Sequence, residues 1–146
     1  MFFESNHFLT TALTQIKTAI LDTGAGGFKV KLAQTPFTPN PNSVPSTDFV
    51  EATYDGYAAV SLTTMTPNTV VGNAYESTST AVAVFQPTGS TTPNTIGGYW
   101  IETGAGALLG YEVLPTPIAL NGPTTYLSIV PRWLSSPTTW PNTILP

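Results

Sequence analysis

Thr80–Leu120 reads TAVAVFQPTGSTTPNTIGGYWIETGAGALLGYEVLPTPIAL and predicts three β-strands in succession. Ala81–Phe85 and Thr95–Glu102 are rich in the apolar, β-branched and aromatic residues that strands favour. The residues between them hold two Pro, one Gly and a Ser-Thr-Thr run, which indicate a long loop. We therefore expect these two strands to pair as a hairpin.

A second turn follows at Thr103-Gly-Ala-Gly106. Glycine accepts positive φ at low cost, so this run suits a tight connection between antiparallel strands. Leu108–Leu114 then returns as a third strand until Pro115 and Pro117 interrupt pairing, because proline has no N–H to donate. The whole stretch is expected to form an antiparallel meander.

The composition indicates an all-β chain with one core. The chain has 146 residues, which is the length of one domain. Only 8% of its residues are charged, against about 25% in an ordinary globular chain. Thr is the commonest residue, and 14 Pro and 12 Gly favour strands and fixed turns over helices. We expect one antiparallel β-sandwich of about seven to nine strands, jelly-roll or immunoglobulin-like, preceded by one N-terminal α-helix.

The charges exclude several classes of partner and ligand. The net charge is −4, and the cations are Lys17, Lys29, Lys31 and Arg132, too few for binding dominated by phosphate contacts. We expect no nucleic-acid partner. The chain has no Cys and one His, His7, so it offers neither a disulfide framework nor a cysteine or histidine metal site.

Neither a membrane span nor a signal peptide is predicted. No run approaches the roughly 18 apolar residues that a spanning helix needs. Met1–Glu4 places an acid where a signal peptide needs positive charge. We therefore expect no membrane partner and no export by the general secretory route.

Residues 1–27 predict an amphipathic helix followed by a glycine-rich hinge. Between Ser5 and Leu21 apolar residues recur at steps of three and four, and Gly24 suits the C′ position. Thr23–Gly27 provides the hinge. The apolar stripe must lie on something, either on the β-domain of its own chain or on a neighbouring subunit, and the sequence leaves both open.

Residues 28–146 form the predicted β-domain. Phe28–Leu32 alternates between apolar residues and lysines, which predicts a half-buried strand, and the lysines also suit a sheet edge. The loop of residues 35–47 contains four Pro and predicts an extended strap across the sandwich. Asp55-Gly56 marks a turn. Residues 132–146 form a tail rich in Trp and Pro.

Two short motifs match known sites but lack the context of those sites. Asp22-Thr23-Gly24 matches the active-site sequence of retropepsin-like aspartic proteases, in which each subunit of a dimer supplies one carboxylate. Here it follows a helical pattern instead of a strand, so we prefer a helix C-terminus and keep the protease as a remote alternative. Gly104–Gly110 resembles a dinucleotide-binding pattern, but a strand follows it, which favours a hairpin turn.

No group of residues predicts catalysis. One His gives no basis for a Ser-His-Asp triad. The acids Asp48, Glu51, Asp55 and Glu76 match the spacing of no ligand loop, so we interpret them as dispersed surface acids. We predict a protein that is not an enzyme, with no catalytic residue, no metal and no cofactor.

The aromatic residues are the candidates for ligand binding. Tyr99 and Trp100 are neighbours, so they face opposite sides of their sheet and one of them points away from the core. With Tyr111 they are candidates for stacking on a ligand such as a sugar; the alternative is that the helix or the strap covers them. Trp133 and Trp140 pose the same choice.

Five segments of the chain resemble a set of small proteins encoded by tailed bacteriophages and prophages. Those proteins carry, in this order, a strand, an F-T-P-x-P loop, an acidic and aromatic G-Y-A segment, an N-T-I-x-G-Y strand and a P-x-P-I/V strand. The resemblance spans residues 28–131 and leaves out the helix and the tail. The segments are Lys31–Gln34, Phe37–Pro41, Asp48–Ala58, Asn94–Tyr99 and Tyr111–Ala119.

The resemblance implies a virion-associated structural protein, either a capsid decoration, a head fibre or a tail component, made in the host cytoplasm without a signal peptide. Such a protein binds copies of itself, with a trimer favoured, and a capsid or tail protein. Few charges predict mainly apolar contacts. The alternative is a carbohydrate- or receptor-binding β-sandwich with surface glycans as ligands. The interface candidates are Phe8, Leu9, Leu13, Ile16, Ile20, Trp133 and Trp140.

Overall fold

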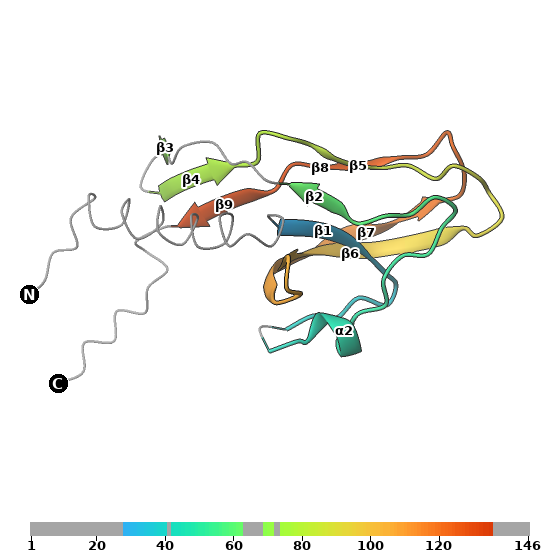
Figure 1. Cartoon of the computed structure of the whole chain (residues 1–146), viewed down its shortest axis with the longest axis horizontal. Helices are drawn as coiled ribbons and strands as arrows, with labels where there is room; N and C mark the ends of the chain where they lie inside the picture. Colours follow the sequence, from blue (N-terminus) through green and yellow to red (C-terminus); the bar gives the residue numbers. More distant parts are fainter. Residues whose placement is uncertain (1–27, 41, 63–68, 72–73, 136–146) are drawn as a thin grey trace, which may run out of the picture.

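The computed structural model describes residues 28–40, 42–62, 69–71 and 74–135. These residues are mostly β and contain nine strands in antiparallel sheets and one short helix (Figure 1). The predicted N-terminal helix with its five interface candidates, the Asp22-Thr23-Gly24 motif and Trp140 lie outside the described residues. The elements are β1 (Phe28–Gln34), α2 (Pro45–Asp48), β2 (Val60–Leu62), β3 (Thr69–Val71), β4 (Ala74–Thr78), β5 (Ala83–Phe85), β6 (Asn94–Thr103), β7 (Leu108–Leu120), β8 (Leu127–Ile129) and β9 (Arg132–Ser135).

A four-stranded sheet in the order β2-β1-β6-β7 is the largest sheet of the described chain. β6 pairs along the whole of β1 on one side and with β7 on the other. The turn between β6 and β7 is closed by the Gly106 N–H, which donates to the Thr103 carbonyl at 2.9 Å, and Gly106 has a φ of +88°. The predicted hairpin at Thr103–Gly106 is therefore confirmed, and glycine is needed there because L side chains rarely adopt that φ.

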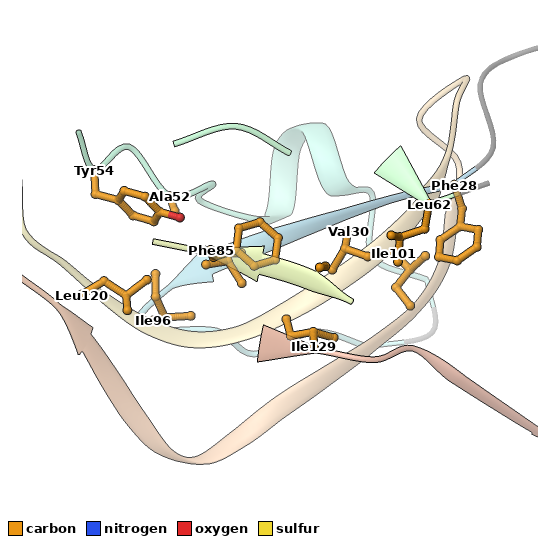
Figure 2. Close-up of a cluster of buried hydrophobic side chains, with 12 residues drawn as sticks. Phe28, Val30, Ala52, Tyr54, Leu62, Phe85, Ile96, Ile101, Leu120 and Ile129 are labelled. Carbon is orange, nitrogen blue, oxygen red and sulfur yellow. The ribbon is translucent and has the colours of Figure 1, made fainter. Parts of the chain in front are cut away.

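The main hydrophobic core lies on one face of this sheet, which we call the inner face (Figure 2). The β5–β8 pair supplies the other side of the core. Alternate side chains of β1 point into it, as the sequence pattern predicts. Burying each large apolar side chain contributes about 1.5–3 kcal/mol. The buried residues are Phe28, Val30, Leu32, Ala52, Tyr54, Leu62, Ala83, Phe85, Ile96, Ile101, Leu120 and Ile129.

A second antiparallel pair, β4–β9, continues the β5–β8 pair at one end (Figure 1). The Ser79 N–H donates to the Pro131 carbonyl at 2.8 Å and joins the two pairs. The buried Ser79 hydroxyl also donates to the Ala81 carbonyl at 2.8 Å, which fixes the irregular backbone between them. β3 adds to β4 and completes a three-stranded sheet in the order β3-β4-β9.

The opposite face of the four-stranded sheet, the outer face, carries a smaller aromatic core. Residues 35–50, which we call the strap, bring Phe37 and Phe49 against Trp100 of β6. The ring centroids of Phe49 and Trp100 are 5.2 Å apart, and those of Phe37 and Phe49 are 5.0 Å apart. The described part of the strap contains no strand, and its short helix α2 was not predicted.

The predicted hairpin between Ala81–Phe85 and Thr95–Glu102 is wrong. β5 pairs with β8 instead, from Ala83 opposite Ile129 to Phe85 opposite Leu127, while β6 belongs to the four-stranded sheet. The loop after β5 therefore connects two layers and does not close a hairpin. Alternation of apolar residues identifies a strand, but it says nothing about a partner more than 40 residues away.

Two further expectations need correction. β1 is not an edge strand, because both halves of its other side are paired. β2 pairs with the first half, and residues 50–52 hydrogen-bond to the second half. β7 does not end at Pro115, because it pairs with β6 again at Ile118–Leu120. Pairing is nevertheless interrupted where the prolines predict, since Leu114–Pro117 form a bulge opposite Gly97.

Candidate functional site

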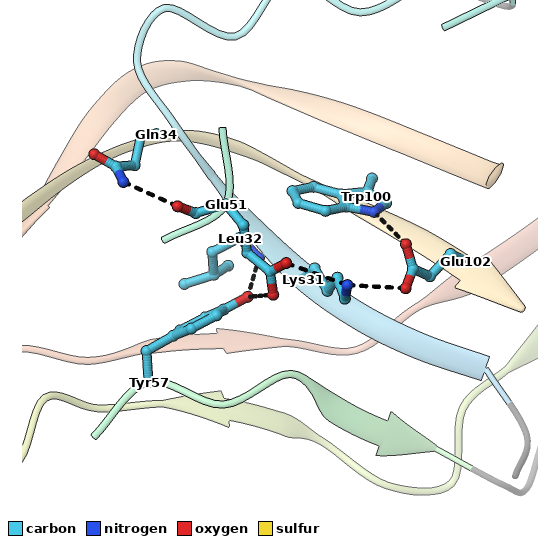
Figure 3. Close-up of polar contacts among 7 residues, drawn as sticks. All are labelled: Lys31, Leu32, Gln34, Glu51, Tyr57, Trp100 and Glu102. Carbon is cyan, nitrogen blue, oxygen red and sulfur yellow. Dashed lines mark hydrogen bonds and ion pairs between the residues drawn. The ribbon is translucent and has the colours of Figure 1, made fainter. Parts of the chain in front are cut away.

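Three charged side chains meet on the outer face, next to the strap (Figure 3). The Lys31 ammonium lies 3.0 Å from Glu102 Oε1 and 3.2 Å from Glu51 Oε2. β1 supplies Lys31, β6 supplies Glu102, and Glu51 lies opposite Ala33 in the segment that follows the strap. These residues are separated by 20 or more positions in the chain, so only the folded sheet brings them together.

Glu102 and Trp100 form the buried half of this cluster. Trp100 Nε1–H donates to Glu102 Oε2 at 2.9 Å, and Glu102 is only 6% exposed. The Lys31 ammonium also lies 5.8 Å from the centre of the Trp100 ring, within the range of a cation–π interaction. A carboxylate this deeply buried is costly without a countercharge, and Lys31 provides it.

Tyr57 connects the cluster to the main core. Its hydroxyl donates to Glu51 Oε1 at 2.9 Å and accepts from the Leu32 N–H at 3.1 Å. Its ring stacks on that of Phe85, with centroids 6.2 Å apart. Gln34 Nε2 holds the Glu51 backbone by donating to the carbonyl at 2.9 Å. Glu51 is thereby fixed at both its side chain and its main chain.

The titration of these groups follows from their partners. Burial lowers the pKa of Lys31, but hydrogen bonds and charge from Glu102 and Glu51 outweigh it, so the pKa is raised. For Tyr57 the effect of burial has the opposite sign, and it is the main reason that the pKa of Tyr57 is raised. Lys31 therefore stays charged at neutral pH. An ammonium held between two carboxylates is a poor general base, because giving up its proton would leave both acids unpaired.

A cavity of about 360 Å³ adjoins the cluster. Its polar groups come from the cluster and from Ser46, and its apolar wall comes from the strap and Trp100. The part of the chain that the structure describes has no buried side-chain N or O atom without a hydrogen-bond partner. Lys31, Glu51, Glu102 and Trp100 thus already satisfy one another beside this cavity. The lining residues are Lys31, Pro45, Ser46, Phe49, Glu51, Trp100, Glu102 and Gly106.

A second cavity of about 450 Å³ borders β7 and the start of β9. Tyr99 and Tyr111 both line it, with Glu112 and Arg132. The Tyr99 hydroxyl donates to Glu112 Oε2, and burial together with this bond raises the pKa of Tyr99. The phenol of Tyr99, the Glu112 carboxylate and the Arg132 guanidinium are groups that can bind hydroxyl-rich ligands. Tyr111 pairs with Trp100, so its side chain points to the other face of the sheet.

The three predicted stacking residues do not form one site. Tyr99 and Trp100 face opposite sides of the sheet, as predicted. Trp100 is the residue that points away from the main core, but it is only 1% exposed because Phe49 and Phe37 of the strap cover it. Its ring is therefore not available for ligand stacking in this structure. Tyr99 is partly exposed beside the second cavity, and Tyr111 is exposed on the other face of the sheet.

The predicted surface acids have specific structural roles. Asp48 Oδ2 accepts from the Val44 N–H at 2.7 Å and closes the turn of α2. Asp55 Oδ2 accepts from the Thr91 hydroxyl and N–H, and these bonds lower the pKa of Asp55. The predicted turn at Asp55-Gly56 is confirmed, with a φ of +81° at Gly56. Glu51 is not a dispersed surface acid, because it belongs to the Lys31 cluster.

The β5–β8 pair has a surface that points away from the main core, and this surface carries apolar side chains and no charged ones. Ala83 and Phe85 of β5 and Leu127 and Ile129 of β8 point toward the main core. The residues between and beside them are exposed because side chains alternate along a strand. We call this surface the ribbon face. It comprises Val82 (50% exposed), Val84 (51%), Tyr126 (66%) and Val130 (47%), together with Gln86 and Ser128.

The structure also bears on Trp133, on membrane-spanning helices and on metal-binding groups. Trp133 lies in β9 opposite Ser77, but its side chain is outside the described part. Within the described residues, no helix is long and apolar enough to cross a membrane. Those residues also hold no group of three or more His, Cys, Asp or Glu side chains that could bind a metal ion. Sequence reasoning missed Lys31 and Glu102, because each has an ordinary strand position and only the pairing of β1 with β6 makes them neighbours.

Comparison of the chain with family models, with curated proteins and with solved structures finds no match in any of the three.

Proposed function

We propose that this chain is a non-enzymatic structural protein of a phage-like particle, serving as a capsid decoration, head fibre or tail component. The ribbon face is the observation that carries this proposal. Four apolar side chains, each about half exposed or more, lie together on one surface of a chain with few charges. Such surfaces are typical of protein contacts. The resemblance of residues 28–131 to phage proteins supports the same function.

The proposal includes a finer description of the fold. The β5–β8 pair and the four-stranded sheet enclose an apolar core, which supports a β-sandwich. The apolar stripe of residues 1–27 supports an N-terminal helix that covers apolar surface. Both features suit a compact module that is presented on a larger assembly.

The Lys31 cluster supports a structural role rather than catalysis. Its ammonium and carboxylates bind one another, Trp100 and Tyr57, so the groups that could transfer a proton are already engaged. The cluster holds the strap side of the molecule to β1 and β6. A catalytic acid or base needs a proton or a lone pair directed at a substrate. In this cluster the protons and lone pairs are directed at the neighbouring side chains of the cluster.

The ribbon face predicts self-association that a single charge disrupts. Val84→Glu places a carboxylate in the centre of the face without touching the main core, and we expect sedimentation velocity to show smaller species than for the unchanged chain. The matched control is Val50→Glu, since Val50 is 61% exposed and lies on the strap. Equal effects of both substitutions would contradict the role of the ribbon face.

Particle association is tested by mass spectrometry of particles purified from cells that produce the chain. A structural component is expected at a fixed ratio to the shell protein, in particles that have been washed at high salt. Recovery of the chain only from the soluble fraction would overturn the proposed function.

A carbohydrate-binding module is the second candidate, and the cavity beside β7 favours it. Tyr99, Glu112 and Arg132 line it, and sugars bind to aromatic rings flanked by polar groups. We expect retention on a glycan array that Tyr99→Ala abolishes and Val50→Ala leaves unchanged. An array without a binding glycan would remove this candidate.

A further inference from the structure

β7 is the last strand of the four-stranded sheet, so one of its edges faces away from β6. Among the described residues β7 pairs only with β6, so the backbone groups of its other edge have no strand partner. Tyr111, Glu112 and Val113 are exposed in succession, although successive residues face opposite sides of a sheet. Within the part of the chain that the structure describes, this stretch of β7 is therefore exposed on both faces and unpaired along its edge.

Other edges of the sheet carry features that discourage pairing with another chain. β2, at the opposite edge, spans only Val60–Leu62. The second half of β7 has the bulge of Leu114–Pro117, and its prolines lack N–H donors. Leu108–Val113 contains no Pro and no Lys. Its pairing with β6 has one register shift near the start, and it is regular from Gly110 to Val113. An edge of this kind is a template for another strand.

We infer that Leu109–Val113 pairs antiparallel with the same segment of a second copy, about a two-fold axis at Tyr111. In this register Tyr111 lies opposite its own counterpart, Gly110 lies opposite Glu112, and Leu109 lies opposite Val113 of the other copy. The pairs are aromatic or apolar, apart from Glu112, which lies opposite a glycine. Cross-strand aromatic and apolar pairs stabilise a sheet by about 0.2–1 kcal/mol each.

The single charge of the segment selects this register over its neighbour. An axis at Glu112 would place two carboxylates directly opposite each other, which is unfavourable. With the axis at Tyr111, each carboxylate meets a glycine, and Gly110 has no heavy atom within 4 Å of an ideal Cβ position. The contact is isologous, so it closes as a dimer and joins two four-stranded sheets into one.

This contact rests on the proposed function for the self-association of the chain, but it uses a different surface from the ribbon face. A particle component that self-associates through two surfaces can extend into a lattice or a closed shell. The ribbon-face contact and the β7 contact are therefore tested by separate variants.

The chain has no cysteine, so introduced thiols report the register directly. Directly opposite residues in an antiparallel pair lie about 4.5–5.5 Å apart between Cα atoms, inside the range of about 4.4–6.8 Å for disulfides. Gly110→Cys and Glu112→Cys chains are mixed and oxidised. The expected product is a disulfide-linked dimer with one chain of each variant, in excess over dimers of either variant alone, whose thiols would lie diagonally about 7–8 Å apart.

A third variant keeps the test decisive if Glu112→Cys fails to fold. Tyr111→Cys replaces an exposed side chain, and its thiol is expected to link to its own counterpart. The control is Thr88→Cys, at an exposed position in the loop between β5 and β6, which should link only slowly. Linkage at position 111 no faster than at position 88, or a mixed dimer no more abundant than the self-linked ones, would overturn the β7 contact.

These outcomes separate the contact from the proposed function. If the chain is found in particles and Val84→Glu disrupts its assembly, but the thiols at β7 do not link, the β7 contact is wrong and the proposed function stands. If the thiols link as expected but the chain is absent from particles, the β7 contact stands and the proposed function is wrong.

Discussion

The two faces of the four-stranded sheet are stabilised by different chemistry. The inner face packs aliphatic and aromatic side chains against β5 and β8, with no charged residue in the cluster. The outer face buries Glu102 and pairs it with Lys31 beside an aromatic group of only a few residues. The inner face therefore depends on apolar burial, whereas the outer face depends on keeping a buried charge balanced. Tyr57 touches both, through its ring and its hydroxyl.

The largest expected effect is on the inner face. Phe85→Ala leaves a cavity in the main core and should lower the free energy of unfolding by about 3–5 kcal/mol, measured by urea denaturation. Val84→Ala, one position along the same strand, is the control. Since Val84 points to solvent, its replacement should change stability by less than about 0.5 kcal/mol. Similar costs at both positions would contradict the assignment of an inner face.

The next effect concerns the charge balance of the outer face. Lys31→Met removes the countercharge of Glu102 and should cost about 3 kcal/mol in the same measurement. Adding Glu102→Gln should recover part of this loss, because a neutral amide can still accept from Trp100 and needs no countercharge. Lys29→Met is the matched control, since Lys29 lies on the same strand and makes no ion pair in the described chain. A loss in the double variant as large as in Lys31→Met would show that Glu102 does not depend on Lys31.

A smaller effect is expected from the close packing of the strap. A Cβ at Gly98 would lie 2.3 Å from Phe37 Cδ1 and 2.4 Å from the Glu112 carbonyl oxygen. Gly98→Ala should therefore cost about 1–3 kcal/mol through overpacking. Gly110→Ala meets open space on the neighbouring strand and should be nearly neutral. A neutral Gly98→Ala would indicate that the strap does not rest on β6.

The smallest effect under ordinary conditions is alkaline destabilisation. Burial raises the pKa of Tyr54 to about 12, and the pKa of Lys31 is also raised. The unfolded chain then releases these protons at lower pH than the folded chain does. Stability is full below the unfolded pKa values of 10.0 for Tyr54 and 10.5 for Lys31, and falls as the pH rises above them. The urea midpoint should be flat from pH 7 to about 9 and then decline, less steeply in Tyr54→Phe. An equal decline in that variant would rule out Tyr54 as a contributor.

The inner face was more predictable from sequence than the outer face, because more of its features depend on residues close together in the chain. Alternation in β1 and the Thr103–Gly106 turn are local signals, so they predicted a half-buried strand and a hairpin correctly. The partner of β5 was not predicted, because pairing of Ala83 with Ile129 depends on which strands the whole chain brings together. The Lys31 cluster was missed for the same reason. Its three charges look like ordinary surface residues until β1, β6 and the segment after the strap lie side by side.

The aromatic residues show the limit of strand periodicity. The opposite orientations of Tyr99 and Trp100 followed from their being neighbours, and the structure confirms them. Whether the ring of Trp100 is exposed or covered depends on the path of the strap. The strap has no periodic sequence pattern from which its path could be predicted. Trp100 is covered because Phe37 and Phe49 reach it, and this contact joins segments about 50 to 60 residues apart in the chain.

Copies of this chain are proposed to assemble through apolar surface, and sedimentation equilibrium at low and high salt tests this assembly most directly. The ribbon face carries no charged residue, so electrostatic screening has little to weaken there. We expect a defined oligomer at low micromolar concentration whose dissociation constant is unchanged or lower in about 1 M NaCl than in about 0.05 M, because salt does not screen apolar contacts. A monomer at every concentration, or an oligomer that dissociates as salt increases, would contradict the account.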